Sequence, residues 1–193
     1  SLEEYALRAQ ESSPTTKAPA PSAKATLPLG KIGKVQISRI LCGGNLISGF
    51  AHSRDLIYVS DLLKAYFAPA KIMETWAQCE QHGINTMIFG LDDKQGVETY
   101  KKYRARGGKI QYLAQINPDP KNLRAAVVGA VDAGAVGAFL VGNTGDEWAR
   151  DGAVGRIGEV VGLIKEAGLI AGVAGHELRT TQLVERAGIA PDF

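Results

Sequence analysis

One pattern recurs along this chain of 193 residues: a helix-like segment ends at a glycine, and a short apolar run follows directly. The clearest example is Gly168–Glu177, and the pattern occurs five times. The five apolar runs predict strands over residues 85–89, 110–116, 136–141 and 169–174, with a further strand beginning at 191. Apolar runs without polar alternation are typical of strands that are buried on both faces. The repeated joints therefore predict an α/β fold with a parallel sheet covered by helices.

The same pattern places helices over residues 95–105, 121–133, 153–167 and 180–187, after a first helix that ends near Gly83. A small hairpin is expected around Gly30 and Gly33, followed by a first core strand over 35–42. Such alternation fits either an open doubly wound sheet or a TIM (β/α)8 barrel. The first strand–helix turn lacks the G-x-G-x-x-G of dinucleotide-binding open sheets. We therefore predict an incomplete TIM barrel, with about five βα units and the start of a sixth strand.

Composition divides the chain into two parts. Residues 1–26 contain a Pro/Ala/Ser/Thr tract that predicts a linker or disordered segment, and residues 27–193 form the expected barrel domain. A net charge of +2 gives no bias toward nucleic acid, and no apolar run reaches the ~18 residues of a membrane span. Two cysteines, Cys42 and Cys79, are expected to be small core residues. The compartment stays open between cytoplasmic and exported after loss of an N-terminal segment.

Three segments, in this order and spacing, resemble the aldo-keto reductase superfamily. They are Leu29–Gly44, Glu80–Phe89 and Ile170–Gly188. The resemblance covers residues 27–193. It implies a TIM barrel that reduces carbonyls with NADPH, using an Asp, a Tyr, a Lys and a His at the ends of strands two to four.

The positions that should carry those residues hold others in this chain. The Asp position falls at Ile88 and no Tyr follows it within five residues, while the Lys position falls near Ile116 and the His position at Gly142. Ala174-Gly175 replaces the Ser-Asn pair that holds the nicotinamide, and the phosphate-binding strands would lie beyond residue 193. We therefore expect the scaffold without its usual catalytic residues, with NADP(H) as a candidate cofactor and no metal assigned.

Residues at the carboxyl ends of barrel strands are the candidates for function. His176 and Glu177 follow the strand over 169–174, and a His there can act as acid/base or bind a metal, with Glu as a second acid/base or ligand. The alternative is that Glu177 caps the next helix and His176 packs over the rim. His52, in the long connection over 46–70, is the third candidate catalytic residue, with a structural role as the alternative. Candidate substrate-binding residues carry amide or guanidinium groups at the same level: Asn45, Arg54, Gln115, Asn117 and Asn143.

Two acidic segments are expected to be structural first. Asp92-Asp93 predicts a turn and the N-cap of the next helix. Asn143–Asp146, after the strand over 136–141, predicts a loop, with ligand binding as the second alternative.

Three functions stay open at this stage. The leading hypothesis is a divergent NADP(H)-linked oxidoreductase, or a relative of one, acting on a small polar, sugar-like ligand. The second is a metal-assisted or cofactor-free isomerase, lyase or hydrolase that uses His176, Glu177 and His52. The third is a non-catalytic ligand-binding protein on the same fold. In each, the expected partner is a small molecule, and a homo-oligomer is allowed.

Overall fold

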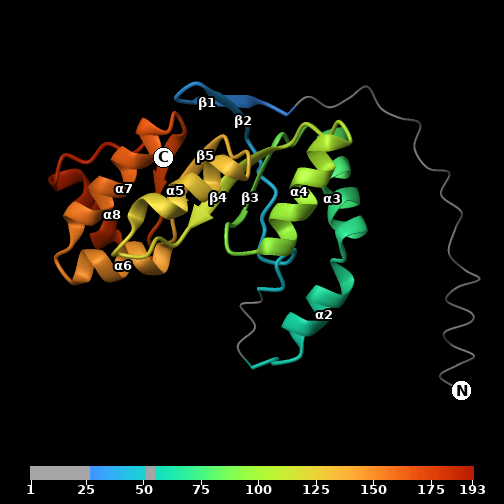
Figure 1. Cartoon of the computed structure of the whole chain (residues 1–193), viewed down its shortest axis with the longest axis horizontal. Helices are drawn as coiled ribbons and strands as arrows, with labels where there is room; N and C mark the ends of the chain where they lie inside the picture. Colours follow the sequence, from blue (N-terminus) through green and yellow to red (C-terminus); the bar gives the residue numbers. More distant parts are fainter. Residues whose placement is uncertain (1–26, 51–54) are drawn as a thin grey trace, which may run out of the picture.

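The chain forms a parallel sheet with helices alternating between its strands, as seen in a computed structural model that describes residues 27–50 and 55–193 (Figure 1). The sheet has the sequential order β3-β4-β5-β6. Its strands are β3 (Thr86–Gly90), β4 (Gln111–Ile116), β5 (Gly137–Leu140) and β6 (Ile170–Val173). The predicted linker over 1–26, together with His52 and Arg54, lies outside the described residues.

Four helices cover one face of this sheet. They are α3 (Pro69–Gln81), α4 (Lys94–Ala105), α5 (Leu123–Asp132) and α7 (Val154–Glu166). Their apolar side chains share one core with the outward-facing residues of the strands, including Trp76, Tyr112 and Ile157. Parallel strands added in sequential order through right-handed crossovers place their helices on the same side, which explains the arrangement. The predicted strands over 85–174 and the predicted helices from residue 95 onward are confirmed to within two residues.

The opposite face is covered at its amino-terminal end by a hairpin of β1 (Leu29–Ile32) and β2 (Val35–Ser38). Val35 and Ile37 pack there against Leu113 and Ile170. The predicted core strand over 35–42 was therefore wrong in its first half. The Ser38 hydroxyl donates to the Ile40 carbonyl at 2.7 Å, where the chain turns out of the hairpin.

Only the last residue of that predicted strand joins the parallel sheet. The Cys42 N–H donates to the Thr86 carbonyl at 3.0 Å, and the Ile88 N–H donates to the Cys42 carbonyl at 2.9 Å. The first core strand is thus reduced to a single parallel bridge at the edge of β3.

At the other edge of the sheet, residues 191–193 lie beside β6, after helix α8 (Leu178–Arg186). The Phe193 N–H donates to the Ala171 carbonyl at 3.4 Å, and the Val173 N–H donates to the Phe193 carbonyl at 3.1 Å. This pair of bonds is the pattern of parallel strands. The Phe193 ring packs against Phe139, with centroids 6.0 Å apart. The chain therefore runs alongside β6 where a further strand was predicted to begin.

Two helices were not predicted. Helix α2 (Val59–Tyr66) lies in the long connection after Cys42, and helix α6 (Gly142–Arg150) follows β5 directly. The prediction of a loop over 143–146 was wrong because Gly, Asn, Thr and Asp are weak helix formers, whereas tertiary burial here outweighs propensity. Six of the nine residues of α6 are buried.

The N-cap predicted at Asp93 is confirmed, since its carboxylate accepts the Gly96 N–H at 2.9 Å. Across the described ranges, no helix is long and apolar enough to cross a membrane.

Candidate functional site

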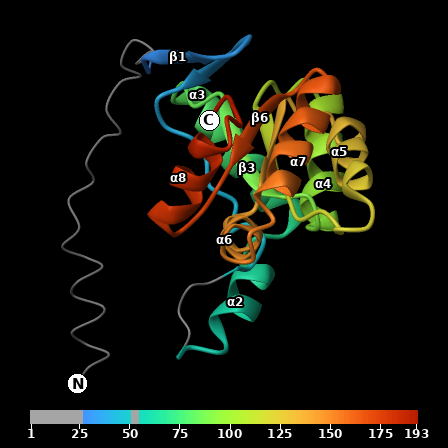
Figure 2. The same cartoon turned by 90° about the vertical axis from the view of Figure 1, so that its left-hand side faces the viewer.

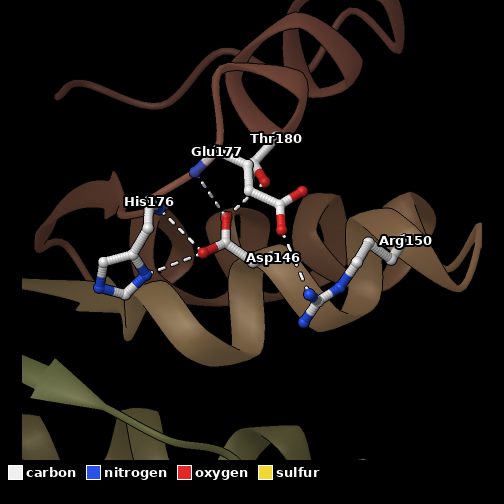
Figure 3. A network of polar contacts seen from close by, with 5 residues as sticks. All are labelled: Asp146, Arg150, His176, Glu177 and Thr180. Atoms are coloured by element: carbon white, nitrogen blue, oxygen red, sulfur yellow. Dashed lines mark hydrogen bonds and ion pairs between the residues drawn. The ribbon is translucent and has the colours of Figure 1, made fainter.

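The most developed polar cluster lies at the carboxyl ends of β5 and β6 (Figure 3). Helix α6 supplies Asp146, and the turn between β6 and α8 supplies His176. The two side chains meet with Nδ1 of His176 2.8 Å from Oδ2 of Asp146. This is the edge of a parallel sheet where α/β proteins place their ligands.

Asp146 is held by four groups from the turn between β6 and α8 and from the first turn of α8. Its Oδ2 accepts the backbone N–H of His176 at 2.8 Å as well as the ring contact. Its Oδ1 accepts the Thr180 hydroxyl at 2.6 Å and the Glu177 N–H at 3.3 Å. The residue is only 4% exposed. The carboxylate therefore organises the whole β6–α8 turn around itself.

The same contacts keep Asp146 ionised. Burial alone would raise the pKa of this carboxyl, but the hydrogen bonds from Thr180, His176 and Glu177 favour the anion, and together they hold its pKa well below the usual value. A carboxylate that stays ionised can only accept hydrogen bonds. Nδ1 of His176 must then carry the hydrogen.

This contact fixes the tautomer of His176. With Nδ1 donating to Asp146, Nε2 of the neutral imidazole is left as a lone-pair acceptor. Figure 3 shows this second nitrogen on the side of the ring turned away from Asp146. The His176 side chain is 69% exposed, whereas the Asp146 side chain alone is 6% exposed. The exposed Nε2 of His176 can therefore accept a proton, while the buried Asp146 carboxylate holds the other ring nitrogen.

Two glycines make room for the pair. A Cβ at Gly142, the first residue of α6, would lie 2.7 Å from Cε1 of the His176 ring. A Cβ at Gly175 would lie 2.8 Å from Oδ1 of Asp146. Non-bonded heavy atoms cannot approach so closely without displacement. The missing side chain at Gly142 therefore lets the imidazole lie against the backbone of α6, and the missing side chain at Gly175 lets the turn lie against the Asp146 carboxylate.

Glu177 is turned to the other side of Asp146, toward Arg150 (Figure 3). Its Oε1 lies 3.2 Å from Nη1 of Arg150, with both side chains at least 40% exposed. An exposed ion pair of this kind contributes about 0–1 kcal/mol. Glu177 occupies the N-cap position of α8, as the structural alternative expected, but its carboxylate makes no capping hydrogen bond. The two adjacent candidates therefore do not act on one centre in this structure.

Two of the predicted substrate-binding residues lie around the same helix start. Oδ1 of Asn117 accepts the Thr144 hydroxyl at 2.7 Å, in the first turn of α6. This bond leaves the Asn117 NH₂ group as the donor available to a ligand. Asn143, the second residue of α6, is exposed.

The remaining predicted residues are elsewhere. Gln115 is in register with Phe139, on the sheet face opposite the helices, and is half-buried. Asn45 follows Cys42 beyond β3, so four strand spacings, roughly 19 Å along the sheet, separate its strand position from β6. The structure does not describe His52 or Arg54.

Sequence reasoning missed the contact of Asp146 with His176 and the bond from Thr180 to Asp146. Asp146 was predicted as a loop residue first and a binding residue second, and Thr180 only as a helix start, because 30 and 34 residues separate the partners in these two contacts. The available signal was the glycine-rich segment Gly142–Gly145 before Asp146, since glycines in a helix start often permit close packing.

The described residues contain no group of three or more His, Cys, Asp or Glu side chains placed to hold a metal ion. Comparison of the chain with protein-family models, with curated proteins and with solved structures gave no match.

Proposed function

We propose that this protein is an enzyme in which His176 transfers protons to and from a small polar ligand at the carboxyl end of the sheet. The observation that carries the proposal is the contact between the buried, ionised Asp146 and Nδ1 of His176. A histidine that only packs over a rim needs no buried carboxylate, yet this one has a carboxylate fixed by three further donors. Histidine is the side chain best suited to exchange protons near neutral pH.

The reaction class that this geometry supports best is cofactor-free proton transfer, as in an isomerase or a lyase. Nε2 takes a proton from the hydroxyl-bearing carbon next to a carbonyl, and the electron pair of that C–H bond moves into the carbonyl to give an enediolate. The imidazolium so formed is stabilised by the adjacent charge of Asp146. Nε2 then returns the proton to the former carbonyl carbon, while the hydroxyl proton moves through solvent to the other oxygen, which gives the isomeric hydroxy-carbonyl compound. Nothing is oxidised or reduced overall by the protein.

Amide donors at the start of α6 suit a ligand rich in oxygen atoms. The Asn117 NH₂ group is free to donate because Thr144 occupies its carbonyl oxygen, and Asn143 is exposed one residue beyond Gly142. Carbonyl and hydroxyl oxygens accept from such groups. A small sugar or hydroxy-carbonyl compound combines these oxygens with an acidic C–H bond.

We further propose that the sheet is part of a TIM-type barrel. Sequential strand order, helices on one face and a parallel pairing of Phe193 with β6 all support this reading. Functional residues in such barrels lie at the carboxyl ends of the strands, where His176 lies.

A second candidate is NADP(H)-linked carbonyl reduction, and one observation favours it. In the resemblance to aldo-keto reductases, the catalytic His position falls at Gly142, and the His176 ring lies directly over this glycine, 2.7 Å from where a Cβ would be. An imidazole contributed by the next strand would then replace the missing one as the proton donor to a carbonyl oxygen. The other three positions still hold residues that cannot supply the usual chemistry.

The two candidates are separated by deuterium exchange. The full chain is incubated in D₂O with a panel of small aldoses, ketoses and hydroxy acids, and loss of the C–H signal next to the carbonyl is followed by proton NMR. We expect exchange with the wild-type chain and a loss of about 100-fold or more in His176→Gln, in line with general acid–base contributions. Arg124→Gln, an exposed site on α5, is the matched control.

Exchange that is unchanged in His176→Gln would refute the site assignment. No exchange, together with His176-dependent oxidation of NADPH on the same panel, would favour the reductase. The absence of both activities would refute the proposal that this protein is an enzyme acting on this class of compound.

A further inference from the structure

Helix α2 carries an exposed apolar surface that the proposed function does not use. None of its eight residues is buried. We call the five side chains Leu56, Ile57, Tyr58, Leu62 and Tyr66 the α2 surface; all are at least 46% exposed, and Ile57 reaches 88%. Figures 1 and 2 show α2 projecting from the end of the molecule that also carries α6. An apolar surface of this size on a projecting helix marks an interaction site.

The helix is held in place by its other side. Val59, Leu63 and Phe67 are half-buried, at a spacing of four residues that puts them on one stripe. The Ser60 hydroxyl donates to the Gly49 carbonyl at 2.6 Å, and the Gln95 amide donates to the Phe67 carbonyl at 3.4 Å. The exposed stripe is therefore presented by a fixed helix and is available without rearrangement.

We propose that the α2 surface joins two copies of this chain around a two-fold axis at Leu62. Tyr58, Leu62 and Tyr66 are four residues apart and form a Tyr–Leu–Tyr stripe that has the same sequence in both directions. Two such helices packed antiparallel bring Leu62 against Leu62 and each Tyr58 against Tyr66 of the second copy. A contact that uses the same patch on both subunits requires this self-complementarity.

The exposed area agrees with a second copy as the occupant. Tyr and Leu side chains of this exposure amount to on the order of 600 Å² per copy, and hence ~1,200 Å² in total, the lower end of stable interfaces. The equal number of acidic and basic residues on α2 gives no attraction to anionic lipid. Because interfaces at this end of the size range are weak, we expect a dimer with a Kd of roughly 1–100 μM.

The test is sedimentation velocity on the full chain between 1 and 500 μM. The wild-type chain should pass from monomer to dimer over this range, and Leu62→Asp should stay monomeric throughout because it places two like charges at the axis. Val128→Asp is the matched control, since Val128 is an exposed apolar residue on α5 at 50% exposure and should leave the dimer unchanged. Circular dichroism confirms that each variant is folded.

A mixing experiment tests the axis itself. Leu62→Asp and Leu62→Lys should each be monomeric alone and should associate when mixed in equal amounts. A wild-type chain that is monomeric at 500 μM would overturn the proposal, as would a dimer that persists in Leu62→Asp. A monomer that binds phosphatidylcholine–phosphatidylserine vesicles through Leu62 would overturn it in favour of a lipid surface.

Discussion

Replacing Asp146 with Asn tests the central contact of the site. The substitution keeps the shape of the side chain but turns one of the two acceptor oxygens into an NH₂ donor. If the remaining oxygen stays on Thr180 and Glu177, the NH₂ group faces the His176 N–H and Nδ1. Nδ1 can then be satisfied only as an acceptor, so the ring must move its hydrogen to Nε2. The basic nitrogen that the site presents is lost without removal of the histidine.

The cost in stability follows from the same four contacts. Hydrogen bonds to a charged group contribute about 1.5–3 kcal/mol each, and a buried donor left facing another donor costs about 1–3 kcal/mol. The substitution weakens the bonds from Thr180 and Glu177, because their acceptor is no longer charged. It also places the new NH₂ group against the backbone N–H of His176. We expect the free energy of unfolding to fall by about 2–4 kcal/mol.

Two measurements check this reasoning. Nitrogen-15 NMR of the His176 ring at pH 8 should show the Nδ1–H tautomer in the wild-type chain and the Nε2–H tautomer in Asp146→Asn. Urea unfolding should give the loss of stability, and the deuterium exchange proposed above should fall by about 100-fold or more. Arg150→Gln, which breaks only the exposed pair with Glu177, should change the unfolding free energy by about 1 kcal/mol at most. An unchanged tautomer in Asp146→Asn would refute the proposed role of the carboxylate.

Three further predictions concern pH, packing and thiol reactivity. Folding lowers the pKa of Asp146, so below pH ~4 the unfolded chain takes up a proton at this residue that the folded chain does not. The contribution of Asp146 to the free energy of unfolding is therefore present above pH ~4 and falls on acidification by about 1.4 kcal/mol per pH unit. Urea unfolding between pH 2 and 6 should show this slope in the wild-type chain and a shallower one in Asp146→Asn; equal slopes would contradict it. Gly142→Ala should displace the exposed His176 ring and lower deuterium exchange at least 10-fold, while the unfolding free energy changes by less than about 1 kcal/mol; full exchange in this variant would show that the ring position does not matter. Partial burial, and secondarily the neighbouring Cys79 thiol, raises the pKa of Cys42 to about 12, so its alkylation by iodoacetamide at pH 8 should be at least about 10-fold slower than that of a free thiol, as followed by mass spectrometry, and should become fast in urea; alkylation of the folded chain as fast as that of a free thiol would contradict this raised pKa.

The polar cluster shows where prediction from sequence stopped. His176 and Glu177 were singled out because they follow a buried strand, and the structure places both beside Asp146. Their different partners were not visible in the sequence. Neighbouring residues diverge according to the φ and ψ angles of the turn, and here that turn is set by a carboxylate 30 residues away.

Helices α2 and α6 show the same limit in secondary structure. Helix α6 is built from weak helix formers around Gly142 and Gly145, and burial of Trp148 and Ala149 stabilises it. Helix α2 has an apolar stripe but lies in a connection whose length suggested a loop. Local patterns predicted the elements whose burial is periodic, and they missed the elements that depend on neighbours distant in the chain.

The sequence by itself determined the alternation of strands and helices, because glycine-ended helices and unbroken apolar runs are local signals that survive without tertiary context. It also determined that His176 stands at the carboxyl end of a strand. Only the tertiary structure decided that the segment over 35–38 joins a hairpin instead of the sheet, and that Asp146 meets His176. These outcomes depend on contacts between residues far apart in the chain, whose geometry is fixed only when the sheet brings its strand ends together.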